Sequence, residues 1–497
     1  MNQKRIALIG YQPAAYFEGF GRCLEDSGFQ VFWAHITRAA AESHRKLAFT
    51  PSSRILDTTS DFQPALSGAE SCRKELSKLE SVGSPRIHDI ILMDRVLRTK
   101  SYQFAICYLN HIHRVLCAFF VDNSIELVSS GRDSALQLMS MLVCRKLGIP
   151  WIVPTRLRIP QDMYMFTFGH ETADIVRIRA PTEEDRAWAE EFLRDFALGS
   201  KKPALKSAAR SFADVVKMAP KHAGLFVSLL RTALLDRKND YSRYTIPQII
   251  WMYLKRRFNL LLYKAFPPYS VPGDQAFCLY ALHTQPESSI DVAGAFFSDQ
   301  VALITLISRS LPVSHELYVK VHPTDVDGKT LSFYRKIAQL PGVRLLSYDV
   351  DSRDLMQRAS IIFALTGTIG YEAGLMGKAV VTFANNYYNA MPTAHYCDAS
   401  SKLPALIDAV LYAKAPQNTR EGLISFLADL KAQSFDGEVN RMYLPAGEPL
   451  TQQDLKTLRD AYKLLHTRLV LSRSEGAPLV IEGSIGQRID HRSGSIV

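Results

Sequence analysis

The stretch that decides the fold is residues 361–383, which read Ile-Ile-Phe-Ala-Leu-Thr-Gly-Thr-Ile-Gly-Tyr-Glu-Ala-Gly-Leu-Met-Gly-Lys-Ala-Val-Val-Thr-Phe. The apolar run 361–365 predicts a buried strand, the hydroxyl-rich run 366–370 a turn into a short helix, and 379–383 the next strand. A helix that begins after a strand at Gly and Thr presents unpaired backbone N–H groups and a positive dipole end. A phosphate fits such an end, so the pattern predicts a nucleotide-linked ligand.

The alternation of strands and helices continues outward from this stretch into both halves of the chain. The strands predicted in addition lie at 5–10, 29–35, 104–107, 125–128, 149–154, 277–282, 316–321 and 343–347. Predicted helices at 14–27 and 134–147 separate some of them, which favours parallel sheets covered on both faces. We therefore expect an α/β, GT-B-like fold with two Rossmann-like domains facing a cleft. Ligands of such sheets bind at the carboxyl ends of the strands.

Composition shifts and proline-rich stretches predict the domain boundaries. We expect an N-terminal Rossmann-like acceptor domain at 1–180, a helical and basic insertion at 181–272, a C-terminal Rossmann-like donor domain at 273–470 and a disordered tail at 471–497. The Gly10 turn that ends the first strand lacks the GxGxxG pattern, so no dinucleotide cofactor is expected.

The positive charge of the chain is concentrated in the predicted insertion. The whole chain has a net charge of +10, and residues 201–264 carry 14 Lys and Arg against 3 Asp, a net +11. Such a patch suits phosphates, an anionic membrane surface or an acidic polymer, whereas no nucleic-acid-binding motif accompanies it. Residues 249–266 are apolar around Lys255-Arg256-Arg257. This segment is either an interfacial helix or a packed helix with a basic exposed face.

Cysteine usage and hydropathy indicate a cytoplasmic protein. The seven cysteines form no CxxC pair and no zinc-ligand spacing, so we expect reduced thiols and no metal site. The N-terminus turns directly into a strand without a secretory signal, and no run of 18 apolar residues is present.

Polar residues at three predicted strand ends of the second half are candidates for donor binding. They are Gln285, Glu287, Lys320, His322, Thr366, Gly367, Thr368, Gly370 and Glu372. The imidazole of His322 could donate to a phosphate oxygen, and the glycines would let the backbone approach it closely. A helix-capping loop around Gln285 and a simple turn at His322-Pro323 are the alternatives.

In the first half, Asp133 follows a predicted strand and precedes a helix. It could act as a general base or as a carboxylate nucleophile. Alternatively, Asp133 or Ser134 only caps the helix. Arg132, Arg156 and Arg158 could bind an anionic acceptor, or could belong to surface loops.

Several of these motifs together resemble the capsule polysaccharide biosynthesis family, which includes capsular Kdo transferases. The motifs are His-Thr-Gln-Pro-Glu-Ser-Ser at 283–289, Asp299-Gln300, Val-Lys-Val-His-Pro at 319–323, Phe333-Tyr334, Asp351-Ser352 and Thr-Gly-Thr-Ile-Gly-Tyr-Glu-Ala at 366–373. The resemblance is dense over about 277–390 and looser from Gly131 to Pro160.

The resemblance implies a metal-independent GT-B glycosyltransferase of capsular or surface polysaccharide assembly. The donor would be a nucleotide-activated sugar, such as Kdo or another sugar acid on CMP. The acceptor would be a glycan or a lipid-linked glycan. The basic segment could hold the enzyme peripherally at the inner face of the cytoplasmic membrane, where lipid-linked acceptors lie. The resemblance maps the phosphate site onto His322, Thr366 and Thr368, and the catalytic carboxylate onto Asp133. The alternatives are a non-catalytic factor of capsule assembly and polysaccharide transport, or a sugar-nucleotide 2-epimerase of the same fold.

Overall fold

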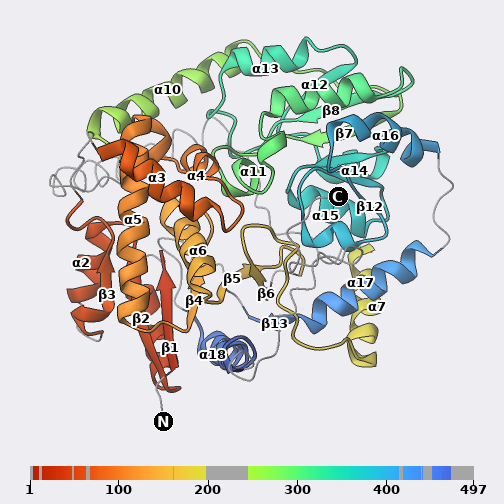
Figure 1. The fold of residues 1–497 in the computed structure, drawn as a ribbon. Coiled ribbons are helices and arrows are strands. Elements are labelled where there is room, and N and C mark those ends of the chain that lie inside the picture. Colours follow the sequence, from red (N-terminus) through yellow and green to blue (C-terminus); the bar gives the residue numbers. More distant parts are fainter. Residues whose placement is uncertain are drawn as a thin grey trace, which may run out of the picture.

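The computed structural model describes residues 4–10, 14–46, 50–62, 68–160, 162–197, 244–412, 418–437, 439 and 450–471. These residues form two domains, each built on one sheet, with helices on both faces (Figure 1). The predicted α/β, GT-B-like fold is confirmed. Residues 472–497 of the predicted disordered tail and residues 201–243 of the basic stretch 201–264 lie outside the described residues.

The first domain contains a sheet of seven strands in the order β13-β6-β5-β4-β1-β2-β3. The strands are β1 (Lys4–Ile9), β2 (Phe29–His35), β3 (Ile55–Asp57), β4 (Leu127–Ser130), β5 (Trp151–Arg156), β6 (Met163–Phe168) and β13 (Ser434–Asp436). The first five are parallel. At one edge β6 runs antiparallel to β5, and β13 runs antiparallel to β6. Its helices are α1 (Ala14–Glu25), α2 (Arg38–Lys46), α3 (Ala69–Glu80), α4 (Ile87–Met93), α5 (Tyr102–Asp122) and α6 (Ala135–Leu147).

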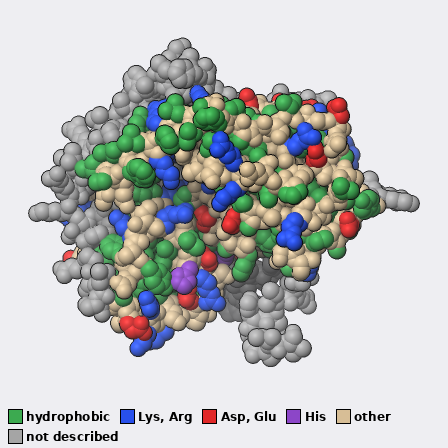
Figure 2. Space-filling model, turned by 90° about the horizontal axis from the view of Figure 1, so that it is seen from above, with side chains coloured by type: hydrophobic (Ala, Val, Ile, Leu, Met, Phe, Trp, Pro, Cys, Tyr) green, Lys and Arg blue, Asp and Glu red, His purple; other side chains and the backbone are tan. Residues whose placement is uncertain are grey.

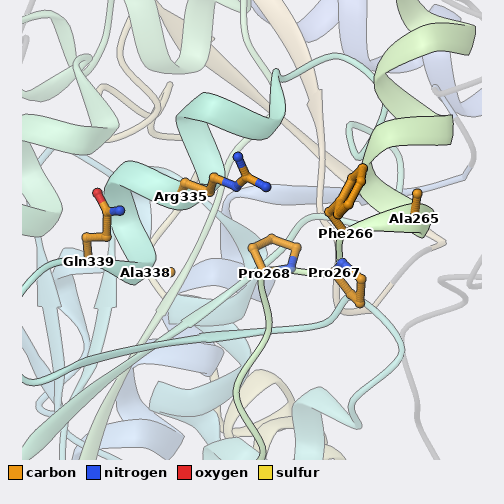
Figure 3. A pocket seen from close by; sticks show the side chains of 7 residues that line it. All are labelled: Ala265, Phe266, Pro267, Pro268, Arg335, Ala338 and Gln339. Carbon is orange, nitrogen blue, oxygen red and sulfur yellow. The ribbon is translucent and has the colours of Figure 1, made fainter.

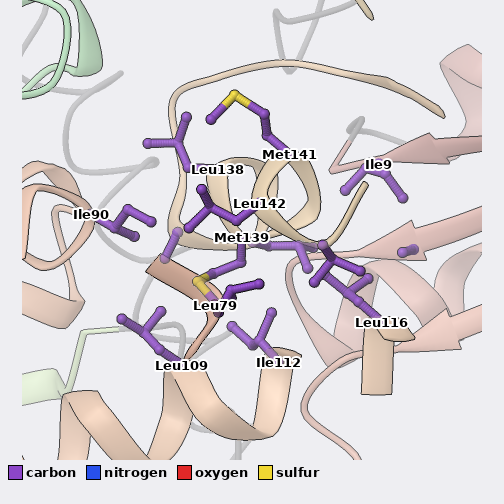
Figure 4. Packing of buried hydrophobic residues seen from close by; sticks show 14 of the residues in the cluster. Ile9, Leu79, Ile90, Leu109, Ile112, Leu116, Leu138, Met139, Met141 and Leu142 are labelled. Atoms are coloured by element: carbon purple, nitrogen blue, oxygen red, sulfur yellow. The ribbon is translucent and has the colours of Figure 1, made fainter. Parts of the chain in front are cut away.

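The predicted strand at 104–107 is wrong, because these residues form the first turn of α5. Ser101 caps this helix by accepting a hydrogen bond from the backbone N–H of Phe104 (3.3 Å). A short apolar run fits a buried helix as well as a buried strand. Here the run continues for 21 residues and packs between α3 and α6 in the core shown in Figure 4.

Among the described residues, α5 is also long and apolar enough to cross a membrane by length and composition. Its most apolar window is 61% buried inside the first domain. The apolar character of α5 is therefore explained by its burial in the core of the first domain.

The second domain has a sheet of six strands in the order β12-β11-β10-β7-β8-β9, and every pair is parallel. The strands are β7 (Phe277–Ala281), β8 (Glu316–Lys320), β9 (Val343–Leu346), β10 (Ile362–Ala364), β11 (Val380–Thr382) and β12 (Ala394–Tyr396). The helices are α11 (Ser288–Asp291), α12 (Gln300–Ser310), α13 (Leu331–Ala338), α14 (Ser352–Arg358), α15 (Thr368–Leu375) and α16 (Leu403–Tyr412).

The chain returns to the first domain after α16, which differs from the predicted boundary at 470. Helix α17 (Thr419–Ala432) packs along α7 (Glu183–Ala197), β13 joins the first sheet, and α18 (Gln452–His466) covers α1. The apolar side chains of α18 fill the first core beside Phe20 and Phe166. Linear order along the chain does not reveal such a return.

The two domains are joined by one apolar cluster and by one long helix. The cluster combines Ile159 and Met163 of the first domain with Tyr371 and Tyr388 of the second, and α7 and α17 complete it. The helix is α10 (Ile246–Ala265), which runs from one domain to the other (Figure 1).

Candidate functional site

The carboxyl ends of three neighbouring strands bring the polar loops of the second domain together. β7 lies between β10 and β8 in the sheet, so the loops that follow these strands are adjacent. The backbone N–H of Leu365 donates to Nε2 of His283 (3.4 Å), and Thr284 Oγ1 lies 3.5 Å from Nδ1 of His322. The sequence stretches 283–287, 322–323 and 366–368 therefore meet at one edge of the sheet.

His283 is a buried part of this edge that the sequence analysis did not assign. Burial, followed by the nearby His322, lowers the pKa of His283 to about 3, so its imidazole is neutral. A Cβ atom on Gly367 would stand 2.7 Å from Cε1 of His283. Glycine at 367 is thus required for close packing against the ring. The position of His283 at the end of a predicted strand is the sequence signal that could have identified it as a site residue.

The hydrogen bonds of His322 fix which of its nitrogens can donate. The backbone N–H of Thr324 donates to Nδ1 (3.3 Å), and the Thr324 hydroxyl lies 2.9 Å from the same atom. Burial, with a smaller contribution from Lys320, lowers the pKa of His322. The neutral ring therefore carries its proton on Nε2, which has no hydrogen-bond partner among the described residues.

Thr366 and Thr368 stand at the N-terminus of α15, beside these histidines. Gly367 is the N-cap and provides no side-chain hydrogen bond to the first turn. The hydroxyls of Thr366 and Thr368 have no hydrogen-bond partner within the described part of the chain. Gly370 instead packs α15 onto the sheet, since a Cβ there would lie 2.8 Å from Cβ of Ala364.

Two other residues predicted to bind the sugar donor, Gln285 and Lys320, form hydrogen bonds within the second domain. The side-chain amide of Gln285 donates to Asp291 (2.9 Å) and to the carbonyl of Ser298 (2.8 Å), and its oxygen accepts from Gln300 (2.7 Å). The ammonium of Lys320, which is buried, donates to the carbonyl of Tyr348 (2.8 Å). Both side chains hold loops of the site in place.

Asp133 projects from the first domain onto the loop of the second. The helix cap is Ser134, whose hydroxyl accepts from the N–H of Gln137 (3.4 Å). The carboxylate of Asp133 accepts instead from the hydroxyl of Ser288 (2.7 Å). Of the two predicted alternatives for the cap, the structure thus has Ser134, and Asp133 lies at the domain interface.

Glu287 adds a second carboxylate at this interface. Burial is the main cause that raises the pKa of Glu287, and the negative charge of Asp133 adds to it. The guanidinium groups of Arg95 and Arg158 act in the opposite direction. The charges of Asp133, Arg95 and Arg158 therefore all act on Glu287 at this interface. Arg95 is not among the site residues predicted from the sequence.

The three arginines predicted to bind an acceptor are placed differently. The guanidinium of Arg132 donates to the hydroxyls of Thr155 (2.7 Å) and Thr167 (2.6 Å) within the first domain. Arg156 ends β5, and Arg158 is exposed beyond it. Arg158 is the one of the three whose charge acts on Glu287.

The comparison with known families falls on the second domain. Residues 261–394 match the family described as capsule polysaccharide biosynthesis protein. This matched segment contains all three loops of the site edge.

Two curated relatives are the capsule polysaccharide modification proteins LipA of Neisseria meningitidis. The serogroup A protein is 29% identical over 103 residues, and the serogroup B protein is 33% identical over 73 residues. These matches cover 21% and 15% of this chain, and they span only 14% and 10% of the two LipA proteins.

Solved structures with a similar fold include two enzymes. The beta Kdo 2,7 transferase KpsC of Thermosulfurimonas dismutans is 10% identical, with 70% of this chain and 89% of that chain covered and a TM-score of 0.32. The UDP-GlcNAc 2-epimerase of Methanocaldococcus jannaschii is 14% identical, with 84% and 97% covered and a TM-score of 0.25. Both likenesses are distant, and the fold assignment rests on the two sheets described above.

Within the matched segment 261–394, Glu372 is a carboxyl group whose ionisation the fold disfavours. Burial raises its pKa from 4.5 to about 7, against a smaller opposing effect of Arg353. The folded state therefore binds this proton more tightly than the unfolded chain does. The free energy of unfolding decreases as pH rises from 4.5 to 7, by about 3 kcal/mol at most.

We expect Glu372→Gln to stabilise the protein at pH 8 and to have little effect on stability at pH 5. Gln cannot ionise, so the loss of stability between these pH values is removed. Thermal unfolding at both pH values measures this difference, and Asp354→Asn, at an exposed carboxylate of α14, is the control. Equal effects of Glu372→Gln at both pH values would contradict the raised pKa.

Proposed function

We propose that the protein is a glycosyltransferase of capsular or surface polysaccharide assembly. The observation that carries this proposal is the contact of Asp133 with Ser288, which brings a carboxylate of the first domain to the donor loop of the second. A two-domain transferase needs this arrangement, because the sugar must react between a donor site and an acceptor site. The capsule polysaccharide biosynthesis match over 261–394 supports the same class of pathway.

The donor would be a nucleotide-activated sugar bound at the second domain. Its phosphate would accept a hydrogen bond from Nε2 of His322 and from the hydroxyls of Thr366 and Thr368. The N-terminus of α15 would add its dipole, and negative charge would build up there as the glycosidic bond breaks. We infer a sugar acid on CMP, such as Kdo, as the donor, and catalysis without a resident metal.

The acceptor would be a glycan or a lipid-linked glycan on the side of the first domain. Asp133 would stand next to the anomeric carbon of the donor sugar, and Arg158 would offer a positive charge to an anionic acceptor. Glu287 would contact the donor sugar, since it lies in the same loop as Ser288.

We expect His322→Ala to weaken nucleotide binding by about 10- to 100-fold, because a hydrogen bond to a charged phosphate is lost. The measurement is a thermal-shift panel of CMP, CDP, UDP, GDP and CMP-Kdo. A ligand at about 100 times its dissociation constant should stabilise the protein by about 2.7 kcal/mol. His315→Ala, at the amino end of β8, is the matched control.

A release assay then separates the enzyme classes. A transferase releases CMP from CMP-Kdo only when an acceptor glycan is present, and we expect EDTA to leave this rate unchanged. Nucleotide released without an acceptor would instead indicate an epimerase-like reaction. If no nucleotide stabilises the protein, the proposed donor site is refuted.

A further inference from the structure

Helix α10 is attached to both domains along one side. At its start, the hydroxyl of Tyr244 donates to the carbonyl of Arg95 (2.6 Å) in the first domain. Further along, Arg256 pairs with Asp327 of the second domain (2.6 Å), and Tyr263 is buried in the second core. The helix therefore lies across both domains, at the top of the molecule in Figure 1.

The opposite side of α10 exposes large apolar side chains. The exposed fractions are 66% for Trp251, 55% for Leu254, 60% for Phe258 and 63% for Leu261. Their spacing of three and four residues places them on one face of the helix. We call these four residues the apolar stripe. An ordinary surface helix buries such a stripe, so its exposure marks an interaction surface.

Cations border the apolar stripe on both sides. Helical periodicity places Lys255 on one side of it, and Arg257 and Lys264 on the other. The sequence of α10 contains no Asp or Glu. In the view from above, hydrophobic side chains and Lys and Arg gather together on this face (Figure 2).

A shallow groove continues this surface beyond the end of the helix. It is lined by Phe266, Pro267 and Pro268 on one side and by Arg335 of α13 on the other (Figure 3). Phe266 is 56% exposed. The groove thus repeats the combination of apolar side chains with a neighbouring cation.

We propose that α10 docks the protein on an anionic lipid bilayer, with the apolar stripe in the boundary between headgroups and acyl chains. A bilayer surface offers apolar chains and phosphate charge within one layer, which matches the stripe and its cationic borders. A second copy of the chain would place the same cations against each other. Lys255, Arg256 and Arg257 in mid-helix also favour lying on the surface over crossing the membrane.

Docking through α10 would place the candidate site close to the membrane surface. Arg95 accepts the hydrogen bond from Tyr244 at the start of α10, and its charge also acts on Glu287 of the site. A lipid-linked acceptor would then reach the site without leaving the bilayer. This last step rests on the proposed glycosyl transfer, whereas the docking itself does not.

The test is flotation of the full chain with vesicles of phosphatidylcholine alone and of phosphatidylcholine mixed with phosphatidylglycerol. We expect binding to the mixed vesicles only. Lys255→Gln with Arg257→Gln should lower the partition coefficient about 30-fold, given about fivefold per cation at an anionic surface. Trp251→Ala with Phe258→Ala should lower it by more than about tenfold. Val313→Ala, at a fully exposed residue away from α10, should change nothing.

Intrinsic fluorescence gives a second readout that depends on the helix itself. Trp33 and Trp151 are buried and Trp188 is half-buried, whereas Trp251 is 66% exposed, so Trp251 is the most exposed of the four tryptophans. We expect mixed vesicles to shift the emission to shorter wavelength. Trp251→Phe should lose this shift and still float with the vesicles.

Three results would overturn the proposal. They are equal binding to both kinds of vesicle, binding that survives all four substitutions of the helix, and absence of binding to the mixed vesicles, with or without self-association through α10. Nucleotide binding by the same preparations is measured in parallel. If the protein binds nucleotide and does not bind vesicles, membrane docking is refuted and the proposed donor site stands. If it binds vesicles and no nucleotide, the proposed donor site is refuted and membrane docking stands.

Discussion

Asp133→Asn is expected to lower the turnover of sugar transfer by at least about a thousandfold and to leave nucleotide binding intact. The substitution removes the only charge of this side chain, while its remaining oxygen can still accept from the hydroxyl of Ser288 (2.7 Å in the native protein). A catalytic carboxylate acts as a base or nucleophile only when it is ionised. Initial rates of CMP release with saturating donor and acceptor measure the effect.

The same substitution should also raise the stability of the protein. The charge of Asp133 is one cause of the raised pKa of Glu287, so the two carboxylates repel each other in the folded state. Removal of one charge relieves this repulsion, and lost activity with gained stability is typical of a functional residue. A purely structural Asp133 would give the opposite pair of results.

Two controls isolate the carboxylate from its surroundings. Ser288→Ala removes the contact between the domains and keeps the charge, so we expect a loss of only about tenfold. Asp122→Asn changes an exposed carboxylate at the end of α5 and should be silent. Turnover by Asp133→Asn within tenfold of the native protein would refute the catalytic assignment.

The sequence predicted the loops of the site because each follows an apolar strand. His322, Thr366 and Thr368 are found at neighbouring strand ends, as parallel strands β8, β7 and β10 require. The sequence alone could not show which polar side chains form hydrogen bonds inside the protein. Gln285 and Lys320 are bonded within the second domain, and Arg132 within the first. Such bonds depend on residues that are distant in sequence.

The same reason explains the errors in the predicted fold. The run 104–107 has the length and composition of a strand, and only its continuation through the core as α5 decides between helix and strand. The return of β13 to the first sheet depends on pairing between Phe435 and Tyr164, which lie far apart in the chain. Local propensity contains no signal for either outcome.

The return of the chain to the first domain leads to the second large expected effect, which is destabilisation by Tyr462→Ala. Tyr462 of α18 is fully buried, and its hydroxyl lies 2.6 Å from that of Ser129 in β4. Its ring packs edge-on against Phe20 and Phe166, with centroids 5.4 and 5.3 Å away. Loss of a buried aromatic ring costs about 3–5 kcal/mol, and the hydrogen bond between the hydroxyls of Tyr462 and Ser129 would also be lost.

This cost should fall on the first domain, although Tyr462 follows the second domain in sequence. Calorimetry of Tyr462→Ala should show the unfolding of the first domain at a lower temperature, while a nucleotide still stabilises the second. Leu464→Ala on the same helix is the matched control, because Leu464 is 37% exposed and should cost less than about 1 kcal/mol. Equal effects of the two substitutions would mean that α18 contributes no core to the first domain. A selective loss would show that the seven-stranded domain depends on residues from both ends of the chain, so a fragment that ends before α18 should lack a stable first domain.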